Sequence, residues 1–164
     1  FPNEWGKSKK VAPAEKPSER REAYTAFFQE LIDELRKRHF TGARIGQPQN
    51  WYSFASGTAG VTYGCSFAQG KQVRAEVYIN TGDQAANKAL FDALDKEKAD
   101  LERQFGESLK WERLDDRSAS RVANYRQGSI DDNPETLAQI RSWAIDRLFQ
   151  FKKVFGPRIA ALAR

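Results

Sequence analysis

The segment VTYGCSFAQGKQVRAEVYI, residues 61–79, has the pattern of two antiparallel strands joined by a tight turn. In both halves apolar side chains alternate with small or polar ones, which is the period of a strand with one buried face. The residues between the halves, Gln69, Gly70 and Lys71, form a three-residue loop in which glycine is expected to take a positive φ. This loop length keeps both apolar sets on one face, and burial of that face fixes the register.

The flanking sequence predicts further strands and three helices. A strand is expected at residues 51–54, and LKWERLDDRSASRVANYR, residues 109–126, alternates as a second strand pair that turns at Asp115-Asp116. Apolar spacing, N-caps and glycine stops indicate helices at residues 18–39, 83–105 and 133–156, the last expected to stop at Gly156-Pro157. The predicted fold class is α+β, with an antiparallel sheet (a three-strand meander plus a later strand pair) backed by three helices. The element order resembles that of the restriction-endonuclease-like core.

The composition is that of one ordered globular domain. The chain has 164 residues, of which 40% are hydrophobic and 12% aromatic, enough to bury a core. Residues 1–17 hold three of the six prolines and are expected to be an interdomain linker, so the predicted domain spans residues 18–164. Because the chain begins at Phe1, it is expected to be a fragment of a longer protein. The single Cys65 argues against disulfides and fits a cytoplasmic protein, and no apolar run approaches the ~20 residues that span a membrane.

Basic charge is concentrated near the C-terminus. The chain carries 27 Lys and Arg against 22 Asp and Glu, a formal charge of +5. Residues 137–164 hold six cations and one acid, whereas residues 81–106 hold four cations and six acids. A basic face attracts polyanions over long range, but a charge run on a helix is more often only a solvated face. Both interpretations stay open at this point.

No catalytic, metal or cofactor site is predicted. The only histidine, His39, falls at a helix end and Cys65 falls on an apolar strand face, so a Cys–His pair is not indicated. A nuclease centre of the restriction-endonuclease-like type needs an acid–x–Lys on a strand, so that carboxylates hold Mg²⁺ and lysine polarises water. Here Tyr78 follows Glu76 in place of the lysine, with Asp83 as a further acid. Glu76 is instead expected to be a cross-strand partner of Arg74 or a hydrogen-bond acceptor on a half-solvated sheet face.

Cationic, amide and aromatic side chains gather in and around the predicted strands. Guanidinium groups fork onto phosphate oxygens, aromatic rings stack on bases, and amide side chains pair with adenine edges. Each arginine also has a structural alternative, such as an exposed ion pair of Arg113 with Glu112 or Asp115. The predicted nucleic-acid-binding residues are Arg44, Gln49, Asn50, Trp51, Arg74, Tyr78, Lys88, Arg113, Arg117 and Arg121.

Short motifs are spread along the chain in a recognisable order. They include Pro48-Gln49-Asn50-Trp51, Tyr78-Ile79, Asn87-Lys88, Trp111-Glu112-Arg113-Leu114 and Phe155-Gly156-Pro157-Arg158. From residue 24 to residue 162 this set resembles the bacterial and archaeal domain of unknown function 4268 family. The resemblance implies a C-terminal domain of a larger prokaryotic protein, often behind a nuclease-like module, in DNA metabolism or defence against foreign DNA. It implies no catalytic residue.

The sequence therefore predicts a non-catalytic accessory domain that binds or positions nucleic acid in a larger nuclease-associated prokaryotic protein. The expected partners are nucleic acid, expected to be DNA, and an N-terminal nuclease-like module of the same chain. A protein-interaction or dimerisation domain, working as a homodimer, is the alternative. A divergent Mg²⁺ nuclease that uses Glu76 and Asp83 is the second alternative. No cofactor and no membrane contact is expected.

Overall fold

The computed structural model describes residues 17–163, and in that range the chain forms one antiparallel sheet of five strands and four α-helices. The strands lie in the order β1-β2-β3-β5-β4. The predicted α+β class with an antiparallel sheet is confirmed, whereas the restriction-endonuclease-like order is not. The predicted linker lies outside the described residues, apart from Pro17. In chain order the elements are α1 (Pro17–Lys37), β1 (Trp51–Ala55), β2 (Val61–Ala68), β3 (Gln72–Ile79), α2 (Gln84–Asp95), α3 (Lys98–Phe105), β4 (Lys110–Glu112), β5 (Ser120–Gln127) and α4 (Pro134–Leu162).

The predicted hairpin is formed by β2 and β3. Gly70 in the turn has a φ of 78°, and Ala68 pairs with Gln72 on either side of it. Both apolar sets face the same side, as the loop length required. They are fully or almost fully buried: Val61, Tyr63, Cys65, Phe67, Val73, Ala75, Val77 and Ile79.

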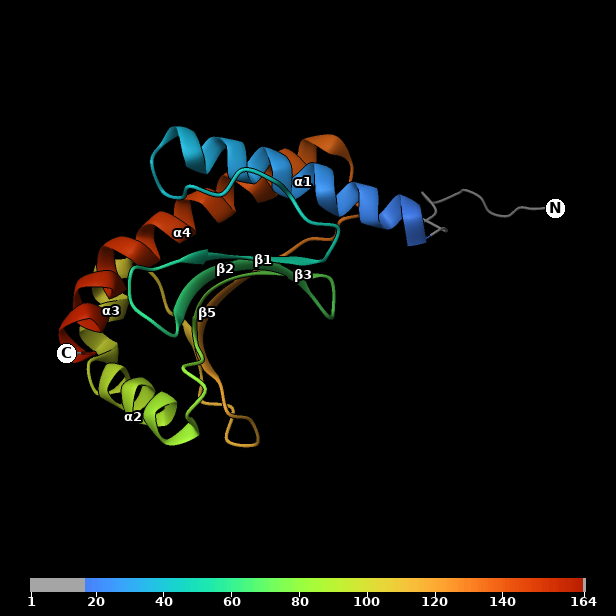
Figure 1. Ribbon diagram of the computed structural model, residues 1–164. Coiled ribbons are helices and arrows are strands. Elements are labelled where there is room, and N and C mark those ends of the chain that lie inside the picture. The colour runs from blue at the N-terminus through green and yellow to red at the C-terminus, as the bar shows by residue number, and fades with distance from the viewer. Residues whose placement is uncertain (1–16, 164) are drawn as a thin grey trace.

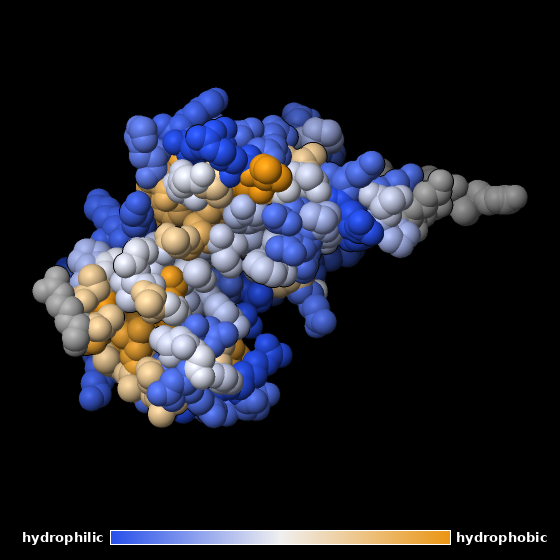
Figure 2. Space-filling view, viewed as in Figure 1, coloured by the Kyte–Doolittle hydropathy of each residue, from blue (hydrophilic) through white to orange (hydrophobic). Residues whose placement is uncertain are grey.

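The helices cover one face of the sheet. Figure 1 shows the strands bending, with the helices outside the bend and no described helix inside it. α4 is central to the helical layer, because it contacts β2, β3 and each of the other three helices. In the same view, Figure 2 shows hydrophilic residues over most of the surface and a hydrophobic patch where α2 meets the C-terminal end of α4. The sheet therefore has a core face and an open face.

The helix predicted at residues 83–105 is wrong as a single element. It is divided into α2 and α3 at Lys96 and Glu97, and Glu97 has a φ of −106° and a ψ of 18°. The break allows each short helix to turn its own apolar residues to the core, Phe91 and Leu94 in α2 and Leu101 and Phe105 in α3.

The predicted end of the last helix is also wrong. α4 begins at Pro134 with Asn133 as its N-cap, as expected, but it continues through Pro157 to Leu162. Proline inside a helix removes a backbone donor and crowds the preceding turn. Ile159, beyond the proline, is 1% exposed, and its burial favours the added turn over an early stop.

Arginines of the basic C-terminal region pair with acids of neighbouring elements, and one of these acids belongs to the acidic region 81–106. Arg147 lies 2.7 Å from Glu107 and Arg141 lies 3.4 Å from Glu30, while Arg158 pairs with Glu97 at the α2–α3 break. The basic run of α4 is therefore used in part for pairing with neighbouring elements. Within residues 17–163 none of the helices combines the length and apolar character that a membrane crossing requires.

Candidate binding site on the open sheet face

Three rows of side chains cross the open face, because each strand contributes every second residue to it. The strand register aligns Trp51, Ser66, Arg74 and Tyr125 in a first row. The middle row is Ser53, Gly64, Glu76, Ala123 and Lys110, and the third row is Ala55, Thr62, Tyr78, Arg121 and Glu112. Rings and guanidinium groups thus occupy the outer rows, whereas the middle row is small except at Glu76 and at Lys110 on the β4 edge. This difference in size creates a hollow across the strands.

The sheet hollow has a volume of about 590 Å³. Trp51 stands at its rim with 48% of its surface exposed, at the start of the edge strand β1. The bend of the sheet places the hollow on the inside, where Figure 1 shows no described helix. The residues that line it are Asn50, Trp51, Tyr52, Ser53, Gly60, Thr62, Ser66, Arg74, Glu76, Tyr78, Asn80 and Arg121.

A charge-balanced network forms the floor of the hollow. Arg74 Nε lies 3.1 Å from Glu76 Oε1, which confirms the predicted pair, and Arg121 Nη1 lies 3.6 Å from the same oxygen. Arg121 also pairs with Glu112, whose other carboxylate oxygen accepts a 2.8 Å hydrogen bond from the Tyr125 hydroxyl. Two guanidinium groups and two carboxylates therefore cancel in formal charge. The floor offers both donors and acceptors rather than a surplus of positive charge.

Glu76 is the least solvated group of this network. Its side chain is 10% exposed, and burial raises the pKa of Glu76, against the opposing effect of Arg74 and Arg121. Within the described residues, Glu76 Oε1 and Arg74 Nε are buried without a hydrogen bond, although they form an ion pair. Gly64 leaves room beside the carboxylate, because a Cβ at that position would lie 3.1 Å from Oε2. The two atoms lie 3.1 Å apart, so each is the other's charged partner although the pair lacks the alignment of a hydrogen bond.

Half of the predicted site residues meet in the hollow. Trp51, Arg74 and Arg121 reach it from β1, β3 and β5, so residues far apart in the sequence converge there. Arg44, Gln49, Lys88, Arg113 and Arg117, although described by the structure, do not line it. The five predicted residues that line it are Asn50, Trp51, Arg74, Tyr78 and Arg121.

Lys88 serves the fold. It is 8% exposed, and its ammonium group contacts the Arg113 carbonyl and donates to the carbonyls of Leu114 at 2.8 Å and Ala119 at 2.7 Å, and to the Ser120 hydroxyl at 2.9 Å. These bonds hold the β4–β5 loop against the start of α2. The predicted phosphate contact does not fit this position, because the buried ammonium has its donors occupied.

Arg113 is engaged by acids outside the hollow. Its Nε lies 2.8 Å and its Nη2 2.9 Å from the two carboxylate oxygens of Asp92, and it also pairs with Asp115, as one alternative anticipated. The hydrogen bonds to Asp92 and Asp115 raise the pKa of Arg113. The hydrogen bond between Arg113 and Asp92 in turn lowers the pKa of Asp92. Arg117 is exposed in the β4–β5 loop and Arg44 is exposed ahead of β1.

Sequence reasoning missed the small and polar residues of the site. It placed Glu76 on the polar face as a partner of Arg74 or as an acid of the nuclease alternative, and it gave no binding role to Thr62 or Ser66. Alternation in β2 was the available signal, because it puts these two residues on the same face as Arg74 and Glu76. Ser53, Gly60 and Asn80 could be found only from the folded chain.

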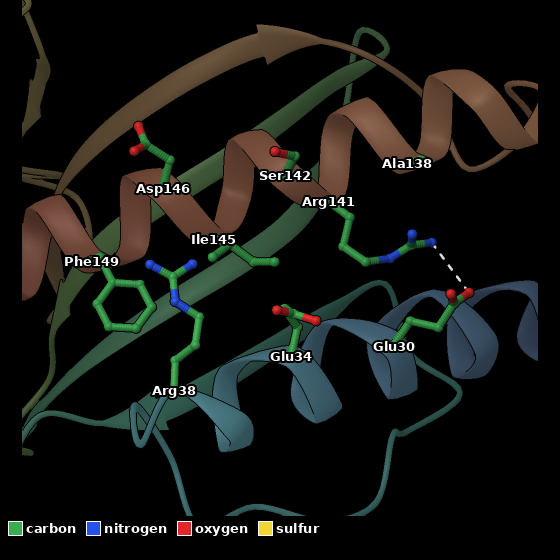
Figure 3. A pocket seen from close by; sticks show the side chains of 9 residues that line it. All are labelled: Glu30, Glu34, Arg38, Ala138, Arg141, Ser142, Ile145, Asp146 and Phe149. Atoms are coloured by element: carbon green, nitrogen blue, oxygen red, sulfur yellow. Dashed lines mark ion pairs between the residues drawn. The ribbon is translucent and has the colours of Figure 1, made fainter.

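A second depression lies between α1 and α4, and Figure 3 shows its lining. Its volume is about 490 Å³. Arg141 reaches Glu30 at 3.4 Å, and the guanidinium carbon of Arg38 lies 4.3 Å from the centre of the Phe149 ring. The ring in this groove is thus covered by an arginine of the same chain. The groove offers no free stacking surface, so we place the candidate site on the sheet.

The described residues give no support to catalysis by a thiol or a metal. Cys65 is fully buried, and burial raises its pKa to about 12, as expected of a core residue. Asp83 caps α2 by accepting a 3.0 Å bond from the Ala85 amide. Across residues 17–163, no group of three or more His, Cys, Asp or Glu side chains is arranged to hold a metal ion.

Comparison with protein families identifies the chain. The model of the family described as "Domain of unknown function (DUF4268)" matches residues 23–159. The chain belongs to the DUF4268 family. The resemblance predicted from the motifs is thereby confirmed. Neither the curated proteins nor the solved structures contain a match to the chain.

Some residues of the motifs that predicted the family lie at or beside the candidate site. Asn50, Trp51 and Tyr78 line the sheet hollow. Asn87 and Lys88 instead tie the start of α2 to the β4–β5 loop, with the Asn87 amide donating a 3.0 Å bond to the Ser118 carbonyl. One set of motif residues therefore faces a ligand-sized space, and the other holds the loop beside it.

Proposed function

We propose that this domain binds single-stranded nucleic acid on the open face of its sheet and positions it in a larger, nuclease-associated cytoplasmic protein of a prokaryote. The observation that carries the proposal is the half-exposed ring of Trp51 at the rim of a polar hollow, on a sheet face that no described helix covers. Aromatic rings displayed on a sheet stack on unpaired bases whatever their sequence.

The balance of charge favours bases over backbone as the main contact. Arg74 and Arg121 are both paired with carboxylates, so neither supplies a free positive charge to a phosphate. Arg74 lies beside the Tyr125 ring, with its guanidinium carbon 5.9 Å from the ring centre, and this row of ring and guanidinium continues to Trp51. A duplex hides its base faces in the stack, so a single strand is the better ligand for such a row.

Anisotropy of a labelled 12-nucleotide strand and of the matching duplex, titrated with the 164-residue chain, tests the proposal. We expect the single strand to bind more tightly, and Trp51→Ala to weaken it about tenfold, the size of one lost base–aromatic stack. Ile45→Ala is the matched control, since Ile45 is 69% exposed and does not line the hollow. An absence of binding at low salt, or equal affinity of Trp51→Ala and the unchanged chain, contradicts the proposal.

The dimerisation alternative draws on the same exposed ring, because β1 is an edge strand and an uncovered edge pairs readily with another chain. Light scattering distinguishes the two: a stable dimer that Trp51→Ala dissociates favours the alternative. The Mg²⁺ nuclease alternative places Glu76 between two guanidinium groups, which oppose a cation. Metal-dependent cleavage that Glu76→Ala abolishes is the result that would favour it.

A further inference from the structure

We propose that the bound strand crosses the open sheet face from the β1 edge to the β4 edge, and that Lys110 contacts one of its phosphate groups. This inference deepens the proposed function and rests on it for the claim that the ligand is a single strand. It adds a phosphate-contacting residue that the sequence patterns did not predict, and it makes the ligand a polymer rather than a free nucleotide.

The first step is the charge that the open face leaves unpaired. The strand register places five charged side chains on this face, and four of them form the charge-balanced network of the floor: Arg74, Glu76, Glu112 and Arg121. The fifth is Lys110, which is exposed and, within residues 17–163, forms no ion pair. The face therefore carries one free positive charge, which lies beside the hollow and not in it.

The second step is the position of Lys110 relative to Trp51. Lys110 pairs with Ala123 in the register, so it ends the middle row at the β4 edge. Trp51 begins the first row at the β1 edge, on the opposite side of the sheet. Strand-to-strand steps of about 4.8 Å from β1 to β4 add up to roughly 19 Å along the sheet. At the roughly 3.4 Å rise of a stacked strand, that span takes about six nucleotides.

The third step is the surface between the hollow and Lys110. Tyr125 stands in the first row and Glu112 in the third, yet the Tyr125 hydroxyl donates a 2.8 Å hydrogen bond to Glu112. The two side chains have to cross the middle row to meet, which explains why Ala123 is fully buried on an open face. The Tyr125 ring stays partly exposed, so a strand that leaves the hollow passes over an aromatic ring before it reaches Lys110.

The fourth step is the chemistry that suits Lys110. A lysine ammonium on its flexible stem attracts a phosphate as a point charge. Glu112, the acid two residues further along the same strand face, is already engaged by Arg121 and by the Tyr125 hydroxyl. The charge of Lys110 is therefore left for a ligand. A lysine on an edge strand also discourages pairing with another chain, and this structural role is the alternative that the experiments separate.

The salt dependence of binding tests the phosphate contact, with a 12-nucleotide thymidine strand as the probe. Loss of one phosphate contact lowers the slope of log affinity against log salt by about 0.7 for a single strand. Lys110→Ala should therefore bind about eightfold more weakly than the unchanged chain at 0.05 M salt and about threefold more weakly at 0.2 M. Lys110→Arg keeps the charge and should keep the slope.

Lys153→Ala is the matched control for Lys110→Ala. It also removes one exposed lysine, but from α4, which lies outside the bend of the sheet (Figure 1). Its affinity should stay within about twofold of the unchanged chain at 0.2 M salt, because salt screens a distant charge. A melting curve for each variant shows that the chain is folded.

Strand length tests the path across the sheet. A thymidine dinucleotide is too short to join Trp51 to Lys110, so Lys110→Ala and the unchanged chain should bind it equally, whereas Trp51→Ala should bind it more weakly. The effect of Lys110→Ala should appear as the strand lengthens and level off at about six nucleotides. An equal effect of Lys110→Ala on the dinucleotide and on the 12-nucleotide strand contradicts the crossing path.

The outcomes separate this inference from the proposed function. If Trp51→Ala weakens strand binding but Lys110→Ala keeps the salt slope of the unchanged chain, the function stands and the crossing path fails. If Lys110→Ala keeps that slope and forms dimers in light scattering, Lys110 guards the edge strand and the path fails likewise. If no strand binds at low salt, both proposals fail.

Discussion

At the scale of single residues, the open face combines a buried carboxylate with a half-exposed indole. Taken as whole residues, Glu76 is 8% exposed and Trp51 is 48% exposed, although both lie on the same face of the same sheet. The difference follows from position, because β3 is an inner strand flanked on both sides and β1 is an edge strand. A ligand therefore meets an accessible ring first and a poorly solvated polar group behind it.

The pH dependence of folding provides a test of the Glu76 environment. Burial raises the pKa of Glu76 in the folded chain above that of the unfolded chain, about 4.3 for a free glutamate. The folded state therefore binds the proton more tightly, and the contribution of this group to stability is lost as pH rises from the unfolded to the folded pKa. As pH rises across that window, the free energy of unfolding of the unchanged chain should fall relative to that of Glu76→Gln. Above the window the two curves of unfolding free energy against pH should run parallel.

Urea unfolding of both chains at half-unit steps between pH 4 and pH 8 measures this difference, with Glu135→Gln as the exposed control. Parallel curves for Glu76→Gln and the unchanged chain over the whole range would show that Glu76 titrates as a solvated carboxyl.

At the scale of elements, the start of α2 organises the strand pair that follows it. Lys88 and Asn87 project from α2 to the loop between β4 and β5, and Leu114 in that loop has a φ of 58°. A left-handed conformation at leucine is unfavourable, so the loop depends on its tertiary bonds. This loop joins β4, which carries Glu112, to β5, which carries Arg121. Its conformation therefore affects how these two side chains are placed at the hollow.

Removal of the Lys88 ammonium group should destabilise the domain. Lys88→Met leaves several buried loop oxygens without a donor, and we expect a loss of about 3 kcal/mol in the free energy of unfolding. Urea denaturation measures the loss, and amide exchange should rise first in residues 113–119. Lys96→Met, at an exposed position in the α2–α3 break, is the control. A loss below about 1 kcal/mol for Lys88→Met would mean that contacts other than those of Lys88 hold the loop in place.

At the scale of the whole molecule, the net charge of +5 is not collected on the candidate site. The arginines of α4 pair with Glu30, Glu97 and Glu107, and the hollow itself is balanced. The exposed Lys152 and Lys153 belong to α4, which packs on the other face of the sheet from the hollow. Long-range attraction to a nucleic acid is therefore weak and spread over the surface.

Removal of these two lysines should leave binding nearly unchanged. Lys152→Ala with Lys153→Ala lowers the formal charge from +5 to +3, yet both side chains lie on the helical side of the sheet, where salt screens their effect on the hollow. We expect the affinity for the 12-nucleotide strand to stay within about twofold at 0.15 M salt. A loss of affinity as large as that caused by Trp51→Ala would indicate that the nucleic acid binds at α4 instead.

Local rules in the sequence determined much of the fold and one part of the site. Strand alternation and the positive-φ Gly70 fixed the β2–β3 hairpin, and Asn133 marked the start of α4. The same alternation put Arg74, Glu76 and Tyr78 together on the polar face. These features depend on neighbours within a few residues, and the period of a strand or a helix reports them directly.

Only the tertiary structure decided which polar groups meet and which are free. The register of β1 on β2 and of β5 on β3 brought Trp51 and Arg121 to the same hollow as Glu76, and no local pattern encodes that alignment. The burial of Lys88 and the capture of Arg113 by Asp92 likewise depend on where the chain returns. Charge in a sequence becomes a binding surface only where folding leaves it unpaired, and pairing is a long-range property.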